Sequence, residues 1–130
     1  MRRCLFVPFL VLLLAVSSCK KNNDSTPPSI TVSSPVSLQQ FNVYDTVTVT
    51  FTASDDVDLG SYSVKLEDTD LLPVLPAFTG TMNGTSQTIS FRFVIDNIRI
   101  ESGGYYLYIE VSDGNNRQHA FVPEIGRAHV

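Results

Sequence analysis

The sequence of 130 residues has no tryptophan, two cysteines and two histidines, and it is poor in basic residues. Two histidines, His119 and His129, leave little for a zinc site or for a catalytic triad that uses histidine as its base. Nine Lys and Arg stand against 13 Asp and Glu, so the formal net charge is −4. A nucleic-acid-binding protein usually carries a surplus of basic residues, which this sequence lacks, so we expect no nucleic-acid partner. The length fits one domain, alone or behind a targeting segment.

The first 18 residues have the order of a secretory signal peptide. Two arginines are followed by an apolar run at residues 5–16, which a single proline interrupts. Two serines come next, directly before Cys19. The apolar run is too short to span a bilayer comfortably, so we predict a cleaved signal at residues 1–18.

The residues before Cys19 read VSS and, with that cysteine, resemble the lipobox of bacterial lipoproteins. The resemblance implies that Cys19 is acylated after cleavage and anchors the protein to a membrane of the bacterial cell envelope. The alternative is an ordinary secretory signal whose cysteine is incidental. Because Cys4 leaves with the signal, a lipidated Cys19 leaves no thiol pair for a disulfide. Lys20 follows the cysteine, at the position where aspartate would indicate inner-membrane retention under the proteobacterial sorting rule for lipoproteins. We therefore expect the outer membrane, and surface exposure stays open.

Residues 20–28 read KKNNDSTPP and contain no apolar side chain besides the two prolines. Such a segment cannot bury enough surface to order itself. Residues 19–28 are therefore predicted to form a flexible tether with a stiffer Pro-Pro end. The tether resembles those of Bacteroidetes lipoproteins.

From residue 29 onward the hydrophobic pattern has a period of two instead of 3.6. Residues 46–54 read TVTVTFTAS, in which every second residue is apolar. This alternation predicts a strand with one buried face and one solvent-exposed face. Residues 61–67, 89–96 and 105–112 repeat the pattern, and Gly, Pro, Asn and Asp separate the runs. With no convincing amphipathic helix beside them, these runs predict an all-β sandwich.

Three stretches resemble bacterial immunoglobulin-like domains: PPSITVSSP from Pro27, YDTVTVTFTASDD from Tyr44, and GYYLYIEVSDGN from Gly104. The resemblance implies an immunoglobulin-like β-sandwich of about seven strands over residues 29–123. It places Tyr105 where these sandwiches often carry a tyrosine corner. The closest likeness is to Bacteroidetes lipoproteins that carry one such domain, of unknown function, after the lipobox.

Residues 124–130 depart from this pattern. The last strand is predicted over residues 117–123, where Phe121 is the large apolar residue expected to close the sheet over the core. The residues after it, EIGRAHV, show no alternation, and IGRAHV resembles the translation of a common sequencing adapter. We therefore expect residues 124–130 to be an exposed, dispensable, non-native tail of a truncated chain. The alternative is a natural, frayed terminus.

The acidic turn at Asp55, Asp56 and Asp58 is a weak candidate for a Ca²⁺ site. Ca²⁺ takes oxygen ligands, and carboxylates two residues apart can share one ion. The EF-hand pattern fails, however, because Gly60 falls on its fifth position and Ser61 on its sixth. The alternative is a solvated turn whose Asp side chains cap backbone N–H groups. We predict no metal and no cofactor.

Tyr106 and Tyr108 lie on the outward phase of the strand predicted over residues 105–112. Exposed neighbouring aromatic residues can stack on sugars or anchor a protein partner, so the pair is a candidate ligand-binding site. The alternative is a sheet face that the loop at residues 68–85, or a further domain, covers.

The sequence carries no motif for catalysis, because it has neither a nucleophile elbow nor a phosphate-binding loop. We predict a non-catalytic, membrane-anchored module of a cell-envelope lipoprotein that acts as a spacer or a protein-interaction domain. The alternative is a carbohydrate-binding accessory lipoprotein of a glycan-uptake system, which would use Tyr106 and Tyr108. The expected partners are the membrane, through the anchor, and an envelope protein or a glycan.

Overall fold

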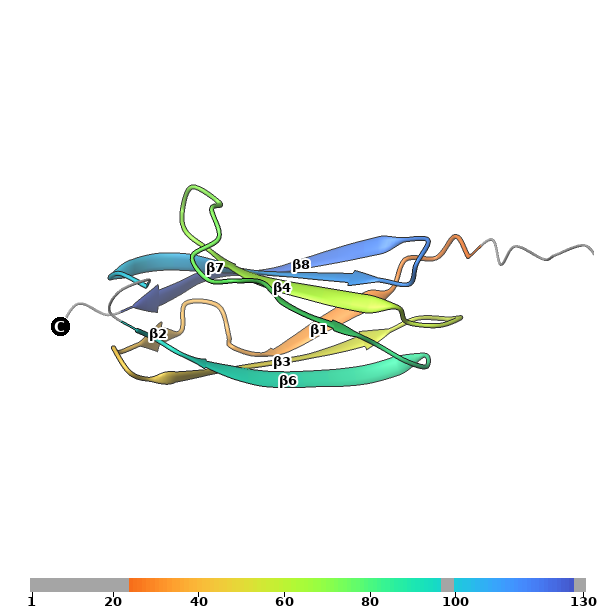
Figure 1. Cartoon of the computed structure of the whole chain (residues 1–130), viewed down its shortest axis with the longest axis horizontal. Coiled ribbons are helices and arrows are strands. Elements are labelled where there is room, and N and C mark those ends of the chain that lie inside the picture. Colours follow the sequence, from red (N-terminus) through yellow and green to blue (C-terminus); the bar gives the residue numbers. More distant parts are fainter. Residues whose placement is uncertain (1–23, 97–99, 128–130) are drawn as a thin grey trace, which may run out of the picture.

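The computed structural model describes residues 24–96 and 100–127. The regular secondary structure in these two ranges consists of strands alone, which confirms the all-β prediction (Figure 1). The strands are β1 (Ser29–Ser34), β2 (Gln40–Phe41), β3 (Thr46–Ser54), β4 (Ser61–Glu67), β5 (Phe78–Thr81), β6 (Ser86–Val94), β7 (Gly103–Ser112) and β8 (Arg117–Arg127). β3 and β4 have the predicted bounds, because each run of alternating residues ends at a turn.

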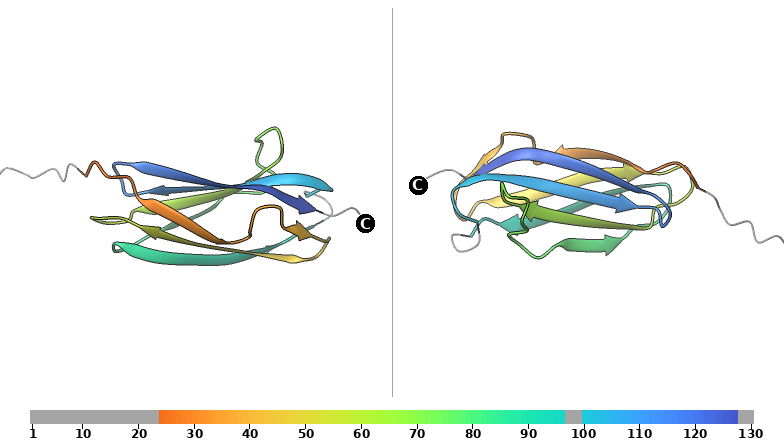
Figure 2. Two further views of the ribbon diagram at one scale, coloured as in Figure 1. Left: turned by 180° about the vertical axis from the view of Figure 1, so that it is seen from behind. Right: turned by 90° about the horizontal axis from the view of Figure 1, so that it is seen from above.

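The strands form two sheets that pack face to face as a β-sandwich (Figure 2). One sheet has three strands in the order β1-β3-β6, and the other has five in the order β2-β8-β7-β4-β5. Neighbouring strands are antiparallel except β2 and β8, which run parallel. The chain passes from the first sheet to the second between β1 and β2, just after the cis Ser34–Pro35 bond. It enters at the end that holds the β3–β4 and β7–β8 turns, and β8 finishes at the opposite end (Figure 1).

The core lies between the two sheets and is built by alternation along the strands. The inward residues of β3 are fully buried: Val47, Val49, Phe51 and Ala53. The inward residues of β7 face them from the other sheet and are also buried: Tyr105, Leu107, Ile109 and Val111. The rings of Phe51 and Tyr62 meet in a T-shaped contact, with the centroids 5.6 Å apart. Each large apolar side chain buried here contributes about 1.5–3 kcal/mol before the entropy cost of folding is subtracted.

The segment at residues 68–85, predicted to be a loop, contains the short edge strand β5. Phe78 of β5 packs on Phe91 of β6 with the ring centroids 4.6 Å apart, and so joins the two sheets along one side. Leu71 and Leu72, in the turn before β5, are 57% and 60% exposed. These two leucines therefore do not pack down on the sandwich.

The prediction that the last strand ends at residue 123 is wrong, and residues 125–127 belong to the domain. β8 continues to residue 127, and Ile125 is only 3% exposed in the core. Gly126 pairs with Gln40 of β2, and its N–H donates to the carbonyl oxygen of Gln39 at 2.9 Å. The hypothesis of a translated adapter concerns the origin of these C-terminal residues, not their place in the fold, and it stays a hypothesis.

A β-bulge in β8 explains why the sequence pattern misleads here. Leu107 of β7 faces Val122, whereas Tyr105 faces Ile125, so β8 advances three residues where β7 advances two. One extra residue moves the inward phase from even to odd positions. Val122 is therefore buried on an even position before the bulge, and Ile125 is buried on an odd position after it. Phe121, expected to close the core, precedes the bulge on the outward phase of β8 and is 54% exposed.

Several predictions fall on residues outside the described ranges. These are the signal peptide at residues 1–18, the lipidated Cys19, the first part of the tether and residues 128–130 of the predicted tail. The described part of the tether runs from Asp24 to Pro28, and Pro28 is buried. Within the described ranges, no helix has the length and apolarity needed to cross a membrane.

Candidate interaction surface

The outer face of the five-stranded sheet carries a cluster of aromatic side chains. Tyr108 lies on the outward phase of β7, as predicted, and is half-buried between its neighbours. β8 places Phe121 directly opposite Tyr108 and places His119 opposite Glu110. We call Tyr108, His119 and Phe121 the aromatic patch. Its two β8 members are exposed at the surface.

Contacts within the aromatic patch hold the Tyr108 ring on several sides. The His119 ring stacks on it with the centroids 5.1 Å apart, and Nδ1 of His119 is hydrogen-bonded to the Tyr108 hydroxyl. Phe121 meets it in an edge-on contact with the centroids 4.8 Å apart. The ammonium nitrogen of Lys65 lies 5.8 Å from the centre of the same ring. The patch therefore has a packed centre and an exposed rim.

Charged groups border the aromatic patch along β7 and β8. A carboxylate oxygen of Glu110 lies 3.6 Å from Nη1 of Arg117, and the other lies 3.5 Å from Nδ1 of His119. Burial raises the pKa of Tyr108, and the negative charges of Glu110 and Glu67 raise it further. The Tyr108 hydroxyl therefore keeps its proton at neutral pH and remains a hydrogen-bond donor.

Tyr106, the other half of the predicted pair, lies further along β7. It faces Glu67 of β4 in the strand register and is half-buried. On the β8 side it falls at the irregular pairing between Val122 and Ile125. The structure thus groups Tyr108 with His119 and Phe121, and it sets Tyr106 apart from them.

Phe121 is an exposed member of the patch that the sequence pattern places wrongly in the core. The signal that could have found it is the phase of His119. His119 falls on the outward or edge phase of the last strand, and Phe121 lies two residues further on the same phase.

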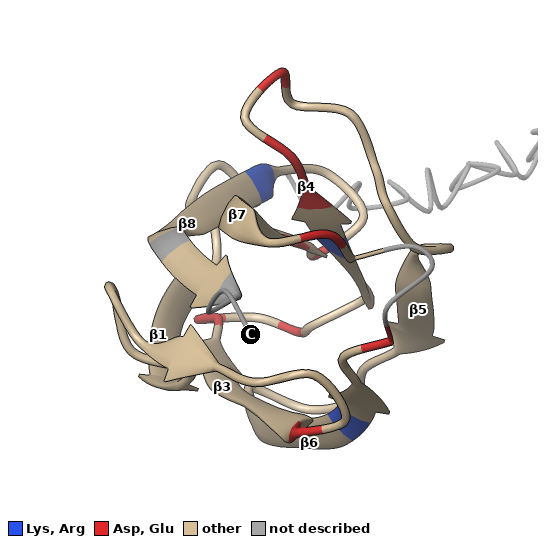
Figure 3. Ribbon diagram, turned by 90° about the vertical axis from the view of Figure 1, so that its left-hand side faces the viewer, with Lys and Arg blue, Asp and Glu red and all other residues tan. Residues whose placement is uncertain are grey.

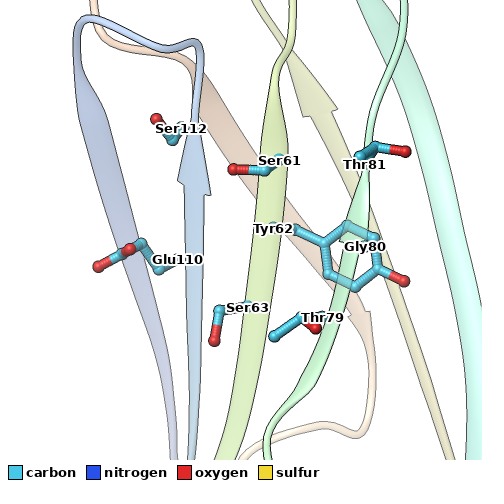
Figure 4. Close-up of a pocket in the computed structure, with 8 residues that line it drawn as sticks. All are labelled: Ser61, Tyr62, Ser63, Thr79, Gly80, Thr81, Glu110 and Ser112. Atoms are coloured by element: carbon cyan, nitrogen blue, oxygen red, sulfur yellow. The ribbon is translucent and has the colours of Figure 1, made fainter.

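A hollow of about 420 Å³ lies beside the aromatic patch, between β7, β4 and β5 (Figure 4). Most of its lining residues carry a hydroxyl group: Ser61, Tyr62, Ser63, Thr79, Thr81 and Ser112. Gly80 and Glu110 complete the lining. The ring of Tyr62 lies against Gly80, where an added Cβ would come within 2.6 Å of a ring carbon. Glu110 both lines this hollow and contacts His119, so the hollow and the patch adjoin.

The acidic turn forms the capped structure that the alternative interpretation describes. Oδ2 of Asp55 accepts hydrogen bonds of 3.0 Å from the N–H groups of Val57 and Asp58. Asp56 and Asp58 are exposed. Among the described residues, the carboxylates that converge are instead Asp55, Asp24 and Asp113. The predicted grouping of Asp55 with Asp56 and Asp58 is therefore not the one that the fold creates.

The model of the family described as "Bacterial Ig domain" matches residues 28–119. The chain belongs to this family. The match agrees with the two-sheet sandwich and confirms the immunoglobulin-like fold class. A domain of this family is a non-catalytic module.

Solved structures with the same fold include parts of a much larger enzyme. The chain is similar to the β-glucosidase of Listeria innocua, with a TM-score of 0.51 and 15% identity over 82% of this chain. A mutant of that enzyme in complex with laminaribiose gives a TM-score of 0.51 and 14% identity over 81% of this chain. The chain spans only 17% and 16% of those two chains, so the likeness concerns the fold alone. No curated protein sequence matches the chain.

Proposed function

We propose that this bacterial Ig domain is a membrane-anchored module of a cell-envelope lipoprotein, acting as a spacer and protein-interaction domain. The observation that carries the interaction role is the aromatic patch, where Phe121 is 54% exposed on an ordered strand. Large aromatic side chains on a rigid sheet lose little entropy on binding, and such residues are enriched among the residues that dominate protein interfaces.

The shape of the domain supports the spacer role. The described chain enters at one end of the sandwich and β8 ends at the other, so the sandwich separates the tether from the end of β8 (Figure 1). Figure 3 looks along this axis and shows acidic residues on the loops, with few basic residues on the described part. An acidic surface favours basic or neutral partners over anionic ones.

The membrane anchor rests on the lipobox at residues 16–19. Cys19→Ala should move the protein from the membrane fraction to the soluble fraction, because the acylation site is lost. Unchanged partitioning into detergent would overturn the anchor without touching the interaction role.

The interaction role is tested by affinity capture from envelope extracts with matched variants. Phe121→Ala should abolish or strongly reduce a specific complex that the wild type captures. Leu71→Ala is the control, because Leu71 is similarly exposed but lies in the turn before β5. A complex lost equally in both variants would contradict the assignment of the binding surface to the patch.

A carbohydrate-binding role is the second candidate, and the hollow beside the patch favours it. Aromatic faces stack on sugar rings, and the adjoining hydroxyl groups and Glu110 can exchange hydrogen bonds with sugar hydroxyls. Binding on a glycan array that disappears with Phe121→Ala or Tyr108→Ala would support this role. Protein capture with no glycan bound would favour the first proposal.

A further inference from the structure

Three segments that are distant in sequence bring carboxylates together at the end where the chain enters. Asp24 precedes β1, Asp55 follows β3 and Asp113 follows β7. One carboxylate oxygen of each residue lies within 4.8 Å of one oxygen of the other two. We call these residues the acidic triad. All three are partly buried.

Local hydrogen bonds fix two members of the acidic triad. Asp55 is held by the bonds that its Oδ2 accepts within the β3–β4 turn and by its N–H, which donates to the carbonyl oxygen of Thr85 at 2.8 Å. Oδ1 of Asp113 accepts hydrogen bonds from the N–H groups of Asn115 and Asn116. The amide of Asn116 also donates to the backbone carbonyl oxygen of Asp24 at 2.9 Å, which draws the tether toward the β7–β8 turn.

A second observation concerns a single atom of Asp55. Its Oδ1 is fully buried and accepts no hydrogen bond. Among the described residues, it is the one buried side-chain oxygen or nitrogen without a hydrogen-bond partner. A buried carboxylate oxygen without a donor is costly, because the charge has lost its water and gained nothing in return. A cation that this oxygen could coordinate would remove that cost.

The electrostatics of the acidic triad point the same way. No member of the triad forms an ion pair with a Lys or Arg side chain in the described ranges, where Glu110 and Arg117 form such a pair. The N–H of Thr26 lowers the pKa of Asp24, but desolvation and the charges of Asp56, Asp55 and Asp113 outweigh it and raise that pKa. Negative charge is therefore concentrated here without a paired basic group.

We propose that a Ca²⁺ ion binds between Asp24, Asp55 and Asp113 and fixes the tether to the sandwich. Ca²⁺ accepts six to eight oxygen ligands in flexible geometry, and three carboxylates with water can supply them. Mg²⁺ demands near-ideal octahedral geometry, and zinc prefers nitrogen and sulfur ligands, which the triad lacks. The expected dissociation constant is on the order of 10⁻⁴–10⁻³ M, the range of Ca²⁺ sites in extracellular modules.

The site has a mechanical consequence that is independent of the lipid anchor and of the aromatic patch. Asp24 belongs to the tether, whereas Asp55 and Asp113 belong to turns of the sandwich. A bound ion would join the three segments and convert the last part of a flexible tether into a directed connection. The proposal therefore stands or falls separately from the proposed function.

The test titrates the full chain with CaCl₂ by isothermal calorimetry and follows thermal unfolding in parallel. Asp24→Asn should weaken Ca²⁺ binding at least tenfold, and Asp24 lies outside the sandwich, so this variant keeps its fold. Asp113→Asn should do the same, with circular dichroism to show that the domain is folded. Asp58→Asn is the matched control, because Asp58 is an exposed carboxylate in the same turn as Asp55.

Three results would overturn the proposal. The first is the absence of heat and of any rise in melting temperature up to about 10 mM Ca²⁺, ten times the upper end of the expected range. The second is an Asp24→Asn variant that binds as tightly as the wild type. The third is an Asp58→Asn variant weakened as much as Asp24→Asn, which would place the ion in the turn alone. If Ca²⁺ slows proteolysis of the tether in the wild type but not in Asp24→Asn, the result would directly support an ion that fixes the tether to the sandwich.

Discussion

The hydroxyl group of Tyr105 donates a hydrogen bond of 2.7 Å to the carbonyl oxygen of Glu101, four residues earlier in the chain. Tyr105 is 7% exposed and lies near the start of β7, with its ring in the core. This is the tyrosine corner that the resemblance to immunoglobulin-like domains places at Tyr105. The bond ties the segment before β7 to the strand that lies at the centre of the five-stranded sheet.

Tyr105→Phe should lower the free energy of unfolding by about 1 kcal/mol, the typical net value of one hydrogen bond. The ring and its packing are kept, and the exposed Glu101 can turn its freed carbonyl to water. Urea denaturation at equilibrium measures the difference. An unchanged midpoint would show that the corner contributes nothing to stability, whereas a loss above about 3 kcal/mol would point to damage in the packing.

Ile125→Ala should lower the free energy of unfolding by about 2–5 kcal/mol, the usual cost of truncating a buried isoleucine. Ile125 is 3% exposed beside the inward residues of β7. Phe121→Ala is the comparison, because it removes a larger side chain that is 54% exposed. It should cost only about 0.5–1.5 kcal/mol, the value of an aromatic pair such as its contact with Tyr108.

The decisive result is which of the two variants loses more free energy of unfolding, and chemical denaturation of both variants measures it. A larger loss for Phe121→Ala would mean that Phe121 faces the core, as expected from sequence, and that β8 pairs with β7 in a different phase. Deleting residues 124–130 should lower the free energy of unfolding as Ile125→Ala does, and it should also remove the pairing of β8 with β2.

Local patterns predict the central strands well because their physical cause is local. In β3 every second residue is apolar, and one face of that strand is buried throughout. The same argument fails in β8, where the bulge between Val122 and Ile125 changes the phase. The bulge lies where β8 pairs with β7, directly before the residues that pair with β2, and alternation along one strand carries no record of either pairing.

The candidate sites were predicted only in part, for the same reason. The outward phase of Tyr108 follows from its own strand, but its neighbours His119 and Phe121 come from β8. The acidic triad joins Asp24 to residues in two later turns, and short-range spacing contains nothing about that approach. Spacing along the chain predicts which residues share a face, and only the topology decides which strands and turns meet.

Gly84→Ala should lower the free energy of unfolding by about 1–2 kcal/mol, because Gly84 has a left-handed backbone with φ of 72°. An added Cβ meets no atom within 4 Å, so strain in the backbone is the only cost. Gly104→Ala is the matched control, since its Cβ also meets open space and its φ is not in that region. Thermal unfolding of both variants separates backbone strain from crowding. Equal losses in the two would contradict this account of the turn at Gly84.

Tyr108 should ionise at higher pH than an ordinary tyrosine, and its titration should be linked to folding. Its pKa is raised from the usual value of 10.0, chiefly by burial and then by the charges of Glu110 and Glu67. A raised pKa means that the fold favours the neutral hydroxyl. The resulting stabilisation is complete below pH 10 and is lost as the pH rises through the higher pKa of the folded state.

Absorbance of the phenolate, recorded against pH for the wild type and Tyr108→Phe, isolates this group among the five tyrosines. The difference between the two curves should have its midpoint above pH 10, because the raised pKa of Tyr108 delays its ionisation. The stability of Tyr108→Phe should also fall less steeply than that of the wild type in the same range. A midpoint at or below 10 would mean that the hydroxyl is freely solvated and that the packed centre of the aromatic patch does not form.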